Sequence, residues 1–444
     1  MKNLHSLRNL RIHFVGIGGI SMSGLAKIAL NLGCKVSGSD LANNGEIDCL
    51  RSMGVDITIP HSADVIHEDI DLIVYSSAIK DNNVEILRGK ELSINMMERA
   101  EFLGVVSQGF NNVIAVAGTH GKTTTTSMIA EILSYANFNP TIHLGGESKS
   151  LGGNTVIGGE DYFIVEACEY KESFRYLKPT IGIITNVELD HVDYYKSFQD
   201  IHNAFEKFSS NCKTVICREE DNISHNSRIV LGQEWTLKHI EFCYNGYNFN
   251  VFHNGRIFGS FRINMLGLHN VYNALNAIVC SYLLGVDLDI LSQAISSLGG
   301  VARRYECIHT FESNCRLIID YAHHPTEISA SVSGIKSIYN RILYIFQPHT
   351  YTRTKALFGD FVEVLSQLEN VVIYQTYPAR EDYLEGGSGE DLWRVLKEKN
   401  NCLYYDNIDD ISSYIAQSCD NFDCVLVLGA GDLAEKLKRT HFNV

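Results

Sequence analysis

A short glycine loop in this chain is followed directly by a lysine and a row of hydroxyl side chains. An apolar stretch, residues 112–117, leads into the loop at 118–121, and Lys122 and Thr123 precede a helix-forming stretch at 124–136. Backbone N–H groups at a helix N-terminus, together with the positive end of the helix dipole, attract phosphate oxygens. A lysine at this position reaches the outer phosphates of a nucleoside triphosphate, and the adjacent hydroxyl binds Mg²⁺. The pattern therefore predicts a nucleoside-triphosphate site.

The loop departs at one position from the common phosphate-loop pattern G-x-x-x-x-G-K-[ST]. Val116 stands where that pattern begins with glycine, so we interpret the loop as a shortened variant. The alternative is a glycine turn before an ordinary helix. The agreement of strand, loop, Lys-Thr pair and helix favours the phosphate loop.

A second glycine loop lies near the N-terminus. Gly16, Gly18 and Ser21 follow the spacing of the dinucleotide-binding pattern G-x-G-x-x-G, with serine in place of the third glycine. Asp40 lies at a suitable distance along the chain for a contact to a ribose. The loop predicts a ligand whose pyrophosphate rests on backbone amides, and a nicotinamide dinucleotide is only one such ligand.

Two polar segments follow apolar strands in the middle of the chain. Glu166 follows the stretch 162–165, and His191 lies shortly after the stretch 181–185. In open parallel sheets, ligands gather at the carboxyl ends of the strands, where the phosphate loop also lies. A carboxylate and an imidazole at this edge would hold a second Mg²⁺ over the phosphates. The alternative, that both are ordinary polar loop residues, stays open.

Two further pairs of residues would contact a ligand only if the fold places them at a binding site. Asn270 and Asn273 are three residues apart at the start of a predicted helix, so their side chains share a face. Two amides on one face either read the hydrogen-bonding groups of a purine or cap the helix. Arg303 and Arg304 follow a predicted hinge at residues 299–300. Such an arginine either reaches a transferring phosphoryl group when domains close or lies on the surface.

Two histidine-rich segments follow strands in the last third of the chain. Residues 320–327 carry His323 and His324 before a proline, and residues 346–353 follow the next strand. Two polar strand ends in one sheet indicate a site. The two histidines also suit the N-terminal residues of a helix, and as metal ligands they have no evident third partner in the sequence.

An α/β fold must position these motifs. Apolar strands alternate with helical stretches, which is typical of parallel sheets with helices on both faces. We predict strands at 11–16, 35–38, 71–76, 112–117, 162–165, 181–185, 214–217, 316–321, 341–346, 371–375 and 424–428, and helices at 22–32, 124–136, 270–284 and 288–298. Within residues 241–263, Asn-Gly pairs at 245–246 and 254–255 predict an antiparallel flap.

The whole chain sets outer limits on organisation and partners. Its 444 residues are too many for one hydrophobic core, and we predict three domains, at 1–110, 111–300 and 301–444. A formal charge of −15 argues against a nucleic acid or an anionic membrane as a partner. No apolar run approaches the roughly 18 residues that a membrane span needs. The 12 cysteines form no C-x-x-C pair, which is typical of reduced thiols in a cytoplasm.

Taken together, these segments resemble the Mur ligase family, and within it the alanine-adding members. The resemblance keeps the family's order of motifs over nearly the whole chain. It is carried by residues 13–26, 118–124, 166–170, 184–193, 269–274, 303–304, 320–327, 346–349, 377–381 and 429–432. The phosphate loop and the asparagine motif are common to the family, whereas the first glycine loop and the histidine-rich segments are more specific to the alanine-adding members.

The resemblance implies three α/β domains. A Rossmann-like first domain would bind a UDP-sugar, a central P-loop ATPase domain with an antiparallel flap would bind ATP, and a Rossmann-like C-terminal domain would bind an amino acid and close over ATP. The implied activity is an ATP- and Mg²⁺-dependent ligation in cytoplasmic peptidoglycan precursor synthesis. It joins L-alanine to the lactyl carboxylate of UDP-N-acetylmuramate through an acyl phosphate.

The resemblance also implies roles for individual residues. The UDP-sugar would lie against Gly16, Gly18, Gly19, Ile20, Ser21, Asp40, Ser76 and Ser77. ATP would lie against Gly118, Thr119, His120, Gly121, Lys122, Thr123, Thr124, Asn270, Asn273, Arg304 and Asp320. Magnesium would be held by Thr123, Glu166 and His191, and the catalytic groups would be Lys122, Glu166, His191 and Arg304. Alanine would lie near Tyr321, His349 and Arg353.

Two residues depart from the family pattern, and four rival functions remain. Ser21 stands where the family often has glycine, and Thr350 where many members carry arginine, which leaves Arg353 as the main candidate for the alanine carboxylate. A ligase that adds a preformed tripeptide shares the ATP motifs, and a folate polyglutamate ligase shares the phosphate loop without a UDP-sugar domain. An NAD-dependent oxidoreductase would leave Lys122 and Glu166 unexplained, and a non-catalytic nucleotide-binding protein would not need them.

Overall fold

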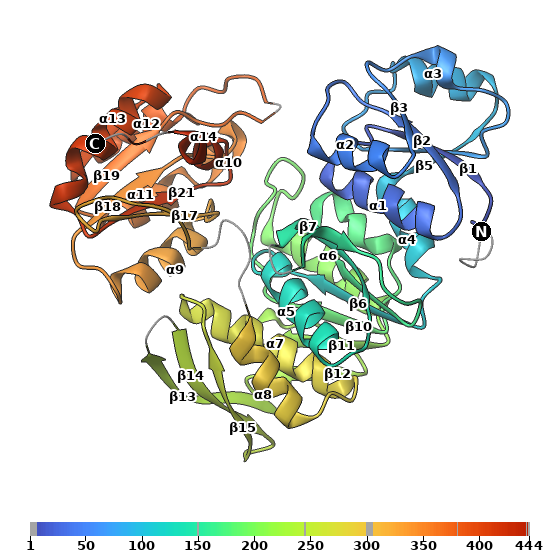
Figure 1. Cartoon of the computed structure of the whole chain (residues 1–444). Coiled ribbons are helices and arrows are strands. Elements are labelled where there is room, and N and C mark those ends of the chain that lie inside the picture. The colour runs from blue at the N-terminus through green and yellow to red at the C-terminus, as the bar shows by residue number, and fades with distance from the viewer. Residues whose placement is uncertain are drawn as a thin grey trace.

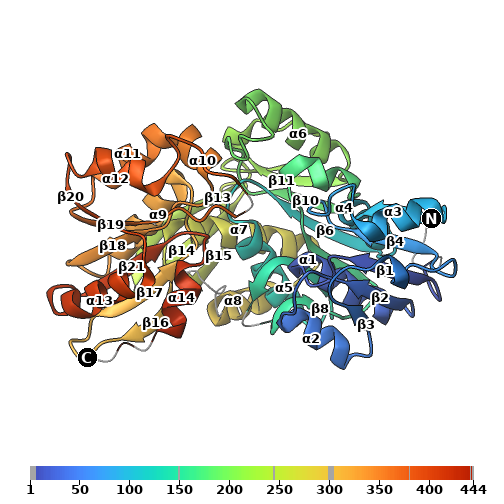
Figure 2. The ribbon, with the colours of Figure 1, turned by 90° about the horizontal axis from the view of Figure 1, so that it is seen from above.

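Three β-sheets follow one another along the chain. The computed structural model describes residues 7–148, 151–243, 246–298, 305–379, 381–440 and 442. Its sheets have five, ten and six strands, and the first and third lie on different sides of the central one in both views (Figures 1 and 2). The predicted α/β fold class is confirmed. The predicted hinge lies outside the described residues, so the boundary near residue 300 stays a prediction.

The first sheet is entirely parallel, in the order β3-β2-β1-β4-β5. Its central strand is buried over four of five positions, because helices cover both faces. The elements are β1 Arg11–Val15, α1 Ile20–Asn31, β2 Lys35–Ser39, α2 Gly45–Ser52, β3 Asp56–Thr58, β4 Leu72–Tyr75, α3 Val84–Glu91, β5 Asn95–Glu98 and α4 Arg99–Ser107.

The central sheet runs β15-β14-β13-β12-β11-β10-β6-β9-β7-β8. Strands β6, β7 and β9–β12 pair in parallel, and β13–β15 form the antiparallel flap. Helices α5, α7 and α8 share one hydrophobic core with this sheet. The elements are β6 Asn112–Ala117, α5 Lys122–Tyr135, β7 Thr141–Ser148, β8 Gly153–Val156, β9 Tyr162–Glu166, β10 Ile181–Ile184, α6 Phe198–Ser210, β11 Thr214–Arg218, β12 Arg228–Leu231, β13 Trp235–Cys243, β14 Gly246–His253, β15 Arg256–Ile263, α7 Leu268–Leu283 and α8 Leu288–Ser297.

The third sheet runs β16-β17-β21-β18-β19-β20, parallel except for the edge strand β16. Separate apolar clusters cover its two faces. The elements are β16 Glu306–Thr310, β17 Arg316–Asp320, α9 Pro325–Lys336, β18 Ile342–Phe346, α10 Tyr351–Ala356, α11 Phe358–Ser366, β19 Asn370–Tyr374, α12 Gly389–Leu396, β20 Asn401–Tyr405, α13 Ile408–Ser418, β21 Cys424–Leu428 and α14 Leu433–Arg439.

The predicted strands are present, but the sequence reading missed β3, β5, β7, β8, β12, β16 and β20. Five of these are edge strands, which are covered less completely and so lack continuous apolar runs. Three helix starts were also wrong, since α7 begins at Leu268 rather than at 270. Helix α1 begins at Ile20 and α5 at Lys122, each two residues early, because a glycine loop before each helix already sets its first turn.

The flap is longer than predicted, since β13 begins at Trp235 rather than at 241. The predicted turn at Asn254 and Gly255 is confirmed, and both residues have positive φ, as a two-residue hairpin of this type requires. The other predicted turn includes residue 245, which lies outside the described residues. No helix in the described part of the chain is long and apolar enough to cross a membrane.

Polar contacts join the outer domains to the central one. Between the first and central domains, the hydroxyl of Ser21 lies 2.9 Å from Nε2 of His143. The side-chain amide of Asn154 also donates to the carbonyl of Ile20 at 2.6 Å. Between the third and central domains, the hydroxyl of Thr326 donates to the carboxylate of Glu188 at 2.8 Å. The edge of the central sheet that carries the phosphate loop therefore faces the third domain.

Candidate functional site

The phosphate loop lies between β6 and α5 and needs two glycines in unusual backbone conformations. Gly118 has φ 140° and Gly121 has φ 79°, and Gly121 is the N-cap of α5. A Cβ on Gly121 would lie 2.7 Å from Oδ1 of Asn273, so the loop and α7 approach closely. No side chain caps α5, and the amides of its first turn are left for a ligand.

Asn186, which follows β10, fixes the loop. Its Oδ1 accepts from the amide of His120 at 2.9 Å, and its Nδ2 donates to the carbonyl of His120 at 3.0 Å. The hydroxyl of Thr119 donates to the carbonyl of Glu188 at 3.0 Å and accepts from the Glu188 amide at 2.9 Å. The loop is therefore preorganised. Asn186 falls within the motif at residues 184–193, but the sequence by itself indicates no separate role for it.

Lys122 is folded back against the loop. Its Nζ donates to the carbonyls of Gly118 at 2.6 Å and Thr119 at 3.0 Å, and to Oε1 of Glu169 at 3.0 Å. Burial by itself would lower the pKa of Lys122, but the Glu169 carboxylate outweighs burial and raises it. The ammonium group is thus charged and lies beside the amides that would hold a phosphate.

Glu169 joins two residues that the sequence singled out separately. Its side chain is 1% exposed, and Oε1 also lies 3.3 Å from Nε2 of His191. The hydroxyl of Tyr195 donates to its carbonyl at 2.6 Å. Burial opposes ionisation, yet Lys122 and His191 together lower the pKa of Glu169. The sequence alone did not predict that Glu169 joins Lys122 and His191. The available signal was a second carboxylate three residues after Glu166.

The predicted magnesium ligands form two groups. The hydroxyl of Thr123 donates to Oε2 of Glu166 at 2.8 Å, and the amide of Gly145 donates to the same oxygen at 3.0 Å. Parallel pairing of β6 and β9 sets Glu166 opposite Val116, just before the loop. His191 instead contacts Glu169. The three predicted ligands thus lie at one sheet edge, with Glu166 and His191 in different hydrogen-bonded pairs.

These residues fit a divalent cation. Hydroxyl and carboxylate oxygens are the donors that Mg²⁺ prefers. Oε2 of Glu169 is buried and has no hydrogen-bond partner among the described residues. A buried carboxylate oxygen without a partner is costly unless a charge compensates it. A cation beside Glu166 and Glu169 would supply that charge.

A pocket of about 170 Å³ lies between the central and third domains, next to the loop. Its lining includes His120, Gly121, Thr124, Asn186, Glu188, Arg218, His269, Asn273, Asp320, Thr326 and Glu327. The pocket therefore brings together residues of β6–α5, α7 and β17 that are far apart in the sequence. This is the space into which a nucleotide on the phosphate loop would extend.

Asn273 lines this pocket on the side of α7, and Asn270 is hydrogen-bonded to it. Asn273 donates to Oδ1 of Asn270 at 3.1 Å, and Asn270 donates to the carbonyl of Leu266 at 2.7 Å. The alternative that they cap the helix is wrong, because α7 has Gly267 as its N-cap without a side-chain cap. Asp320 lines the same pocket from the third domain, and its Oδ1 accepts from the amide of Ala322 at 2.9 Å.

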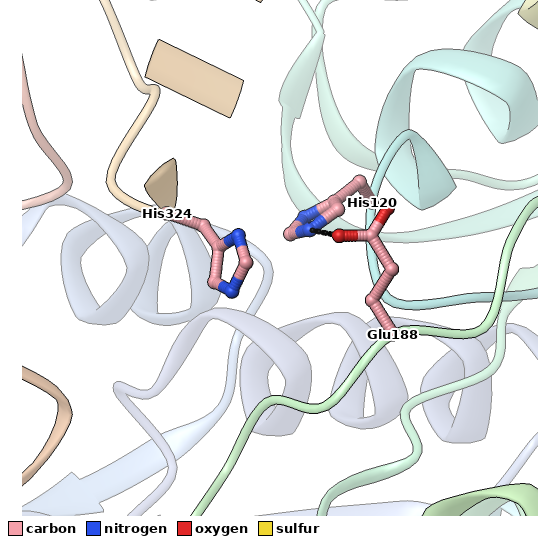
Figure 3. A group of neighbouring side chains, drawn as sticks. All are labelled: His120, Glu188 and His324. Atoms are coloured by element: carbon pink, nitrogen blue, oxygen red, sulfur yellow. Dashed lines mark ion pairs between the residues drawn. The ribbon is translucent and has the colours of Figure 1, made fainter. Parts of the chain in front are cut away.

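Residues of two domains also meet around His120 (Figure 3). Its Nδ1 lies 3.2 Å from Oε1 of Glu327, and its Nε2 lies 3.5 Å from Oε2 of Glu188. Its ring centroid lies 4.7 Å from that of His324, which is the N-cap of α9. Burial would lower the pKa of His120, but Glu327 and Glu188 outweigh it and raise the pKa to about 9.

The predicted alanine positions gather in the third domain. The rings of Tyr321 and His349 lie 5.3 Å and 5.9 Å from that of His323. Nη1 of Arg353 lies 3.1 Å from Nδ1 of His349. Arg353 also pairs with Asp190 of the central domain, Nε to Oδ1 at 3.1 Å. Sequence reasoning missed this partner, because nothing local connects the two residues.

The first glycine loop is hydrogen-bonded to Asp40, the residue predicted to contact a ribose. Oδ2 of Asp40 accepts from the amide of Gly18 at 2.8 Å, and Oδ1 accepts from the amide of Leu41 at 2.7 Å. Ser21 lies in the first turn of α1, so the position does not require positive φ, and serine is compatible with it. The ends of β1 and β4 are paired in register, and the amide of Ser76 donates to the carbonyl of Val15 at 3.4 Å, so Ser76 lies beside this loop.

Arg303 and Arg304 lie outside the described residues, so their predicted contact with phosphate stays a prediction.

Comparison with known proteins matches this arrangement over almost the whole chain. Residues 11–111 match the Mur ligase family catalytic domain, 116–281 the Mur ligase middle domain, and 303–431 the Mur ligase glutamate ligase domain. A UDP-N-acetylmuramate–L-alanine ligase of Lachnospira eligens is 42% identical and is aligned over 96% of each chain.

Solved structures agree. A UDP-N-acetylmuramate–alanine ligase of Thermotoga maritima has a TM-score of 0.82 at 31% identity, covering 97% of this chain and 98% of that one. A murein peptide ligase of Psychrobacter arcticus has a TM-score of 0.72 at 24% identity, covering 98% and 100%, which shows the shared fold alone. The family predicted from the motifs is confirmed: this chain belongs to the Mur ligase family of ATP-dependent ligases.

Proposed function

We propose that this chain joins L-alanine to the lactyl carboxylate of UDP-N-acetylmuramate, with ATP as the energy source, in cytoplasmic peptidoglycan precursor synthesis. The observation that carries the proposal is one sheet edge. The phosphate loop with Lys122 and the Thr123–Glu166 pair lie there, and Arg353 of the third domain reaches the same edge through Asp190. A likeness to relatives named for this reaction supports the choice of substrates.

The reaction would proceed in two steps. The lactyl carboxylate attacks the γ-phosphorus of ATP, which gives an acyl phosphate and ADP. The amine of alanine then attacks the acyl carbon, loses a proton, and expels inorganic phosphate. A carboxylate at neutral pH resists attack by an amine, so the phosphoryl group supplies the leaving group that the second step needs.

The protein would contribute mainly positioning and charge compensation. The amides of the first turn of α5 and the ammonium of Lys122 would hold the outer phosphates. Bound Mg²⁺ would compensate negative charge on the phosphates. Thr123, Glu166 and, through Glu169, His191 are the residues that would hold it. Contact between the central and third domains would exclude water, which otherwise hydrolyses an acyl phosphate.

Arg353 is the residue best suited to the carboxylate of alanine. Its guanidinium has five N–H donors, and its contacts with Asp190 and His349 already fix its direction. Tyr321 and His349 flank it, and Thr350 directly precedes its helix α10. An amino acid bound there would bring its amine toward the edge where the phosphates lie.

The nearest rival adds a preformed tripeptide instead of alanine. The murein peptide ligase with this fold is less similar in sequence than the alanine-adding relatives, and its likeness speaks for the fold only. The decisive difference lies in the amino-acid site of the third domain, so direct competition between the two substrates discriminates between the hypotheses.

The test is release of inorganic phosphate by the purified full chain with Mg²⁺-ATP and UDP-N-acetylmuramate. L-alanine, L-serine, glycine and the tripeptide would be supplied in turn, with mass spectrometry of the product. We expect the L-alanine adduct, with glycine about 10–200-fold less efficient because one methyl group is worth about 1–3 kcal/mol. Preferential use of the tripeptide, or no phosphate release with any amino acid, would contradict the proposal.

A further inference from the structure

Three side chains between the central and third domains form a cluster that takes no step in the proposed ligation chemistry, although His120 and Glu188 also line the pocket beside the phosphate loop. His120 belongs to the phosphate loop, Glu188 follows β10, and His324 precedes α9. Each offers one ligand atom, and these atoms all lie within 4.8 Å of one another. Figure 3 shows the two imidazole rings and the carboxylate converging from separate segments of the chain.

The polar atoms of this cluster are incompletely satisfied. Nε2 of His324 is buried without a hydrogen-bond partner among the described residues, and Nε2 of His120 has only the long contact of 3.5 Å with Glu188. His324 is only 6% exposed. Its Nδ1 makes one long contact, 3.4 Å from the amide of Thr326. Buried polar atoms normally have partners, so an imidazole nitrogen without one, next to a second imidazole with only a long contact, calls for a ligand.

Glu327 orients His120 toward the cluster. Its carboxylate lies 3.2 Å from Nδ1 of His120, which leaves Nε2 directed to Glu188 at 3.5 Å. A carboxylate on the far nitrogen of an imidazole is the usual means by which proteins fix the tautomer and direction of a metal-binding histidine. Thr326 holds Glu188 in turn, by a hydrogen bond of 2.8 Å.

We infer that His120, Glu188 and His324 bind a transition-metal cation of the Zn²⁺ class, which joins the central domain to the third domain. Two imidazoles and one carboxylate are a donor set that suits Zn²⁺, whereas Mg²⁺ prefers oxygen ligands. Metal–ligand distances of about 2.0–2.2 Å place tetrahedral ligand atoms roughly 3.4 Å apart. The 3.5 Å between His120 and Glu188 is close to this spacing, and the ligand atom of His324 lies within 4.8 Å of both and would move closer on binding.

A proton alone explains less than a metal does. A proton on His120 accounts for its two glutamate contacts, but it leaves Nε2 of His324 without a partner. A bound cation would use both rings and release that proton to solvent. The proposed zinc site also differs in its ligand atoms from the Thr123–Glu166 pair, which offers only oxygen atoms to a metal.

The ligands come from both sides of the domain boundary, so their loss can be tested from each side. His324→Asn removes the imidazole but keeps a residue that caps a helix well. Glu188→Gln removes the charge with little change of shape. His239→Asn is the matched control: His239 is exposed in the flap and has φ 52°, which asparagine tolerates.

The experiment is equilibrium dialysis of the full-length proteins against Zn²⁺ in buffer with millimolar Mg²⁺, with metal content measured by mass spectrometry. The wild type and His239→Asn should hold one more tightly bound zinc than His324→Asn and Glu188→Gln, whose affinity should fall roughly a hundredfold. The free cysteines and any magnesium position are present in all four proteins. Zinc bound at those places therefore cancels in the comparison.

Two further measurements make the result decisive. Thermal melting in the presence of a chelator should give similar midpoints for all four proteins, which shows that they are folded. Zinc should raise the midpoint of the wild type and of His239→Asn only, because a cation that binds the folded state alone stabilises it. Equal zinc content in the wild type and His324→Asn would overturn the inference. Loss in His324→Asn with retention in Glu188→Gln would overturn the assignment of Glu188 as a ligand.

Discussion

Nζ of Lys122 lies 3.0 Å from Oε1 of Glu169, and the carboxylate is 1% exposed. The two residues lie on different strand-to-helix connections of the central sheet and form a buried ion pair beside the phosphate loop. Removing one partner of such a pair typically costs about 3–5 kcal/mol, because the other charge is left buried and uncompensated. The lysine of the phosphate loop therefore has a structural role in addition to the proposed contact with phosphate.

Lys122→Ala should abolish nearly all ligation and also lower the stability of the central domain. The double variant Lys122→Met with Glu169→Gln removes both charges and should melt closer to the wild type while remaining inactive. Phosphate release and calorimetry separate the two effects. If the double variant recovers ligation, Lys122 does not contact the phosphates.

Arg353→Ala should raise the KM for alanine more than the KM for ATP. Its guanidinium lies 3.1 Å from Nδ1 of His349, and the family resemblance assigns it to the alanine carboxylate. Asp190→Asn is the matched comparison, since it keeps Arg353 but weakens the ion pair at 3.1 Å, and it should affect the KM for alanine less. Steady-state kinetics with each substrate varied provides the measurement. Equal effects of Arg353→Ala on both constants would remove Arg353 from the amino-acid site.

Gly121→Ala should weaken binding of Mg²⁺-ATP about tenfold or more, a loss of about 1.4 kcal/mol or greater. The new Cβ would lie 2.7 Å from Oδ1 of Asn273 at a φ of 79°, so the loop must move. Gly33→Ala introduces similar backbone strain at φ 83° with no heavy atom within 4 Å, and should leave ATP affinity unchanged. Isothermal titration of both variants tests this. Equal losses would show that backbone strain alone, rather than the loop, explains the effect.

Glu85→Gln should destabilise the first domain in a pH-dependent manner. Glu85 is fully buried, and its carboxylate accepts from Ser39 at 2.5 Å and from the amide of Ser62 at 2.9 Å. Burial would raise the pKa of Glu85, but His13 and Ser39 outweigh it and lower the pKa below the ordinary 4.5. A lowered pKa in the folded state gives stability that is present above pH 4.5 and is lost as the pH falls through the folded value.

The stability difference between wild type and Glu85→Gln should therefore be largest near neutral pH, at about 1–3 kcal/mol, and should shrink in acid. Hydrogen exchange of peptides from residues 11–107 reports the first domain by itself, which matters because three domains need not unfold together. A difference that grows as the pH falls would contradict the lowered pKa.

Local patterns were sufficient for the phosphate loop and for most buried strands. Gly118, Gly121, Lys122 and Thr123 act within one short segment, so their order alone specifies a strand, a tight turn and a helix N-terminus. The Asn254–Gly255 hairpin is equally local, since only residues that accept positive φ suit that turn. Edge strands escaped detection because they are partly covered and carry mixed side chains.

Contacts between residues that are far apart in the sequence could not be predicted from local patterns. Glu169 lies in the motif at residues 166–170, but nothing in the sequence shows that it meets Lys122 and His191. Asp190 was overlooked for the same reason, since its partner Arg353 is 163 residues away. The helix-cap interpretation of Asn270 and Asn273 was wrong because the N-cap is Gly267, whereas the one for His324 was correct.

The amino-acid sequence by itself determined the family, the α/β class and the chemistry of the phosphate loop, because each depends on residue types at short and fixed spacings. The tertiary structure alone decided which charges compensate one another. It buried Glu169 beside Lys122, turned Asp190 toward Arg353, and brought His120, Glu188 and His324 together. The physical reason is that ion pairs and metal ligands depend on distances of a few ångströms between distant segments, which are set by sheet register and by the contact between two domains.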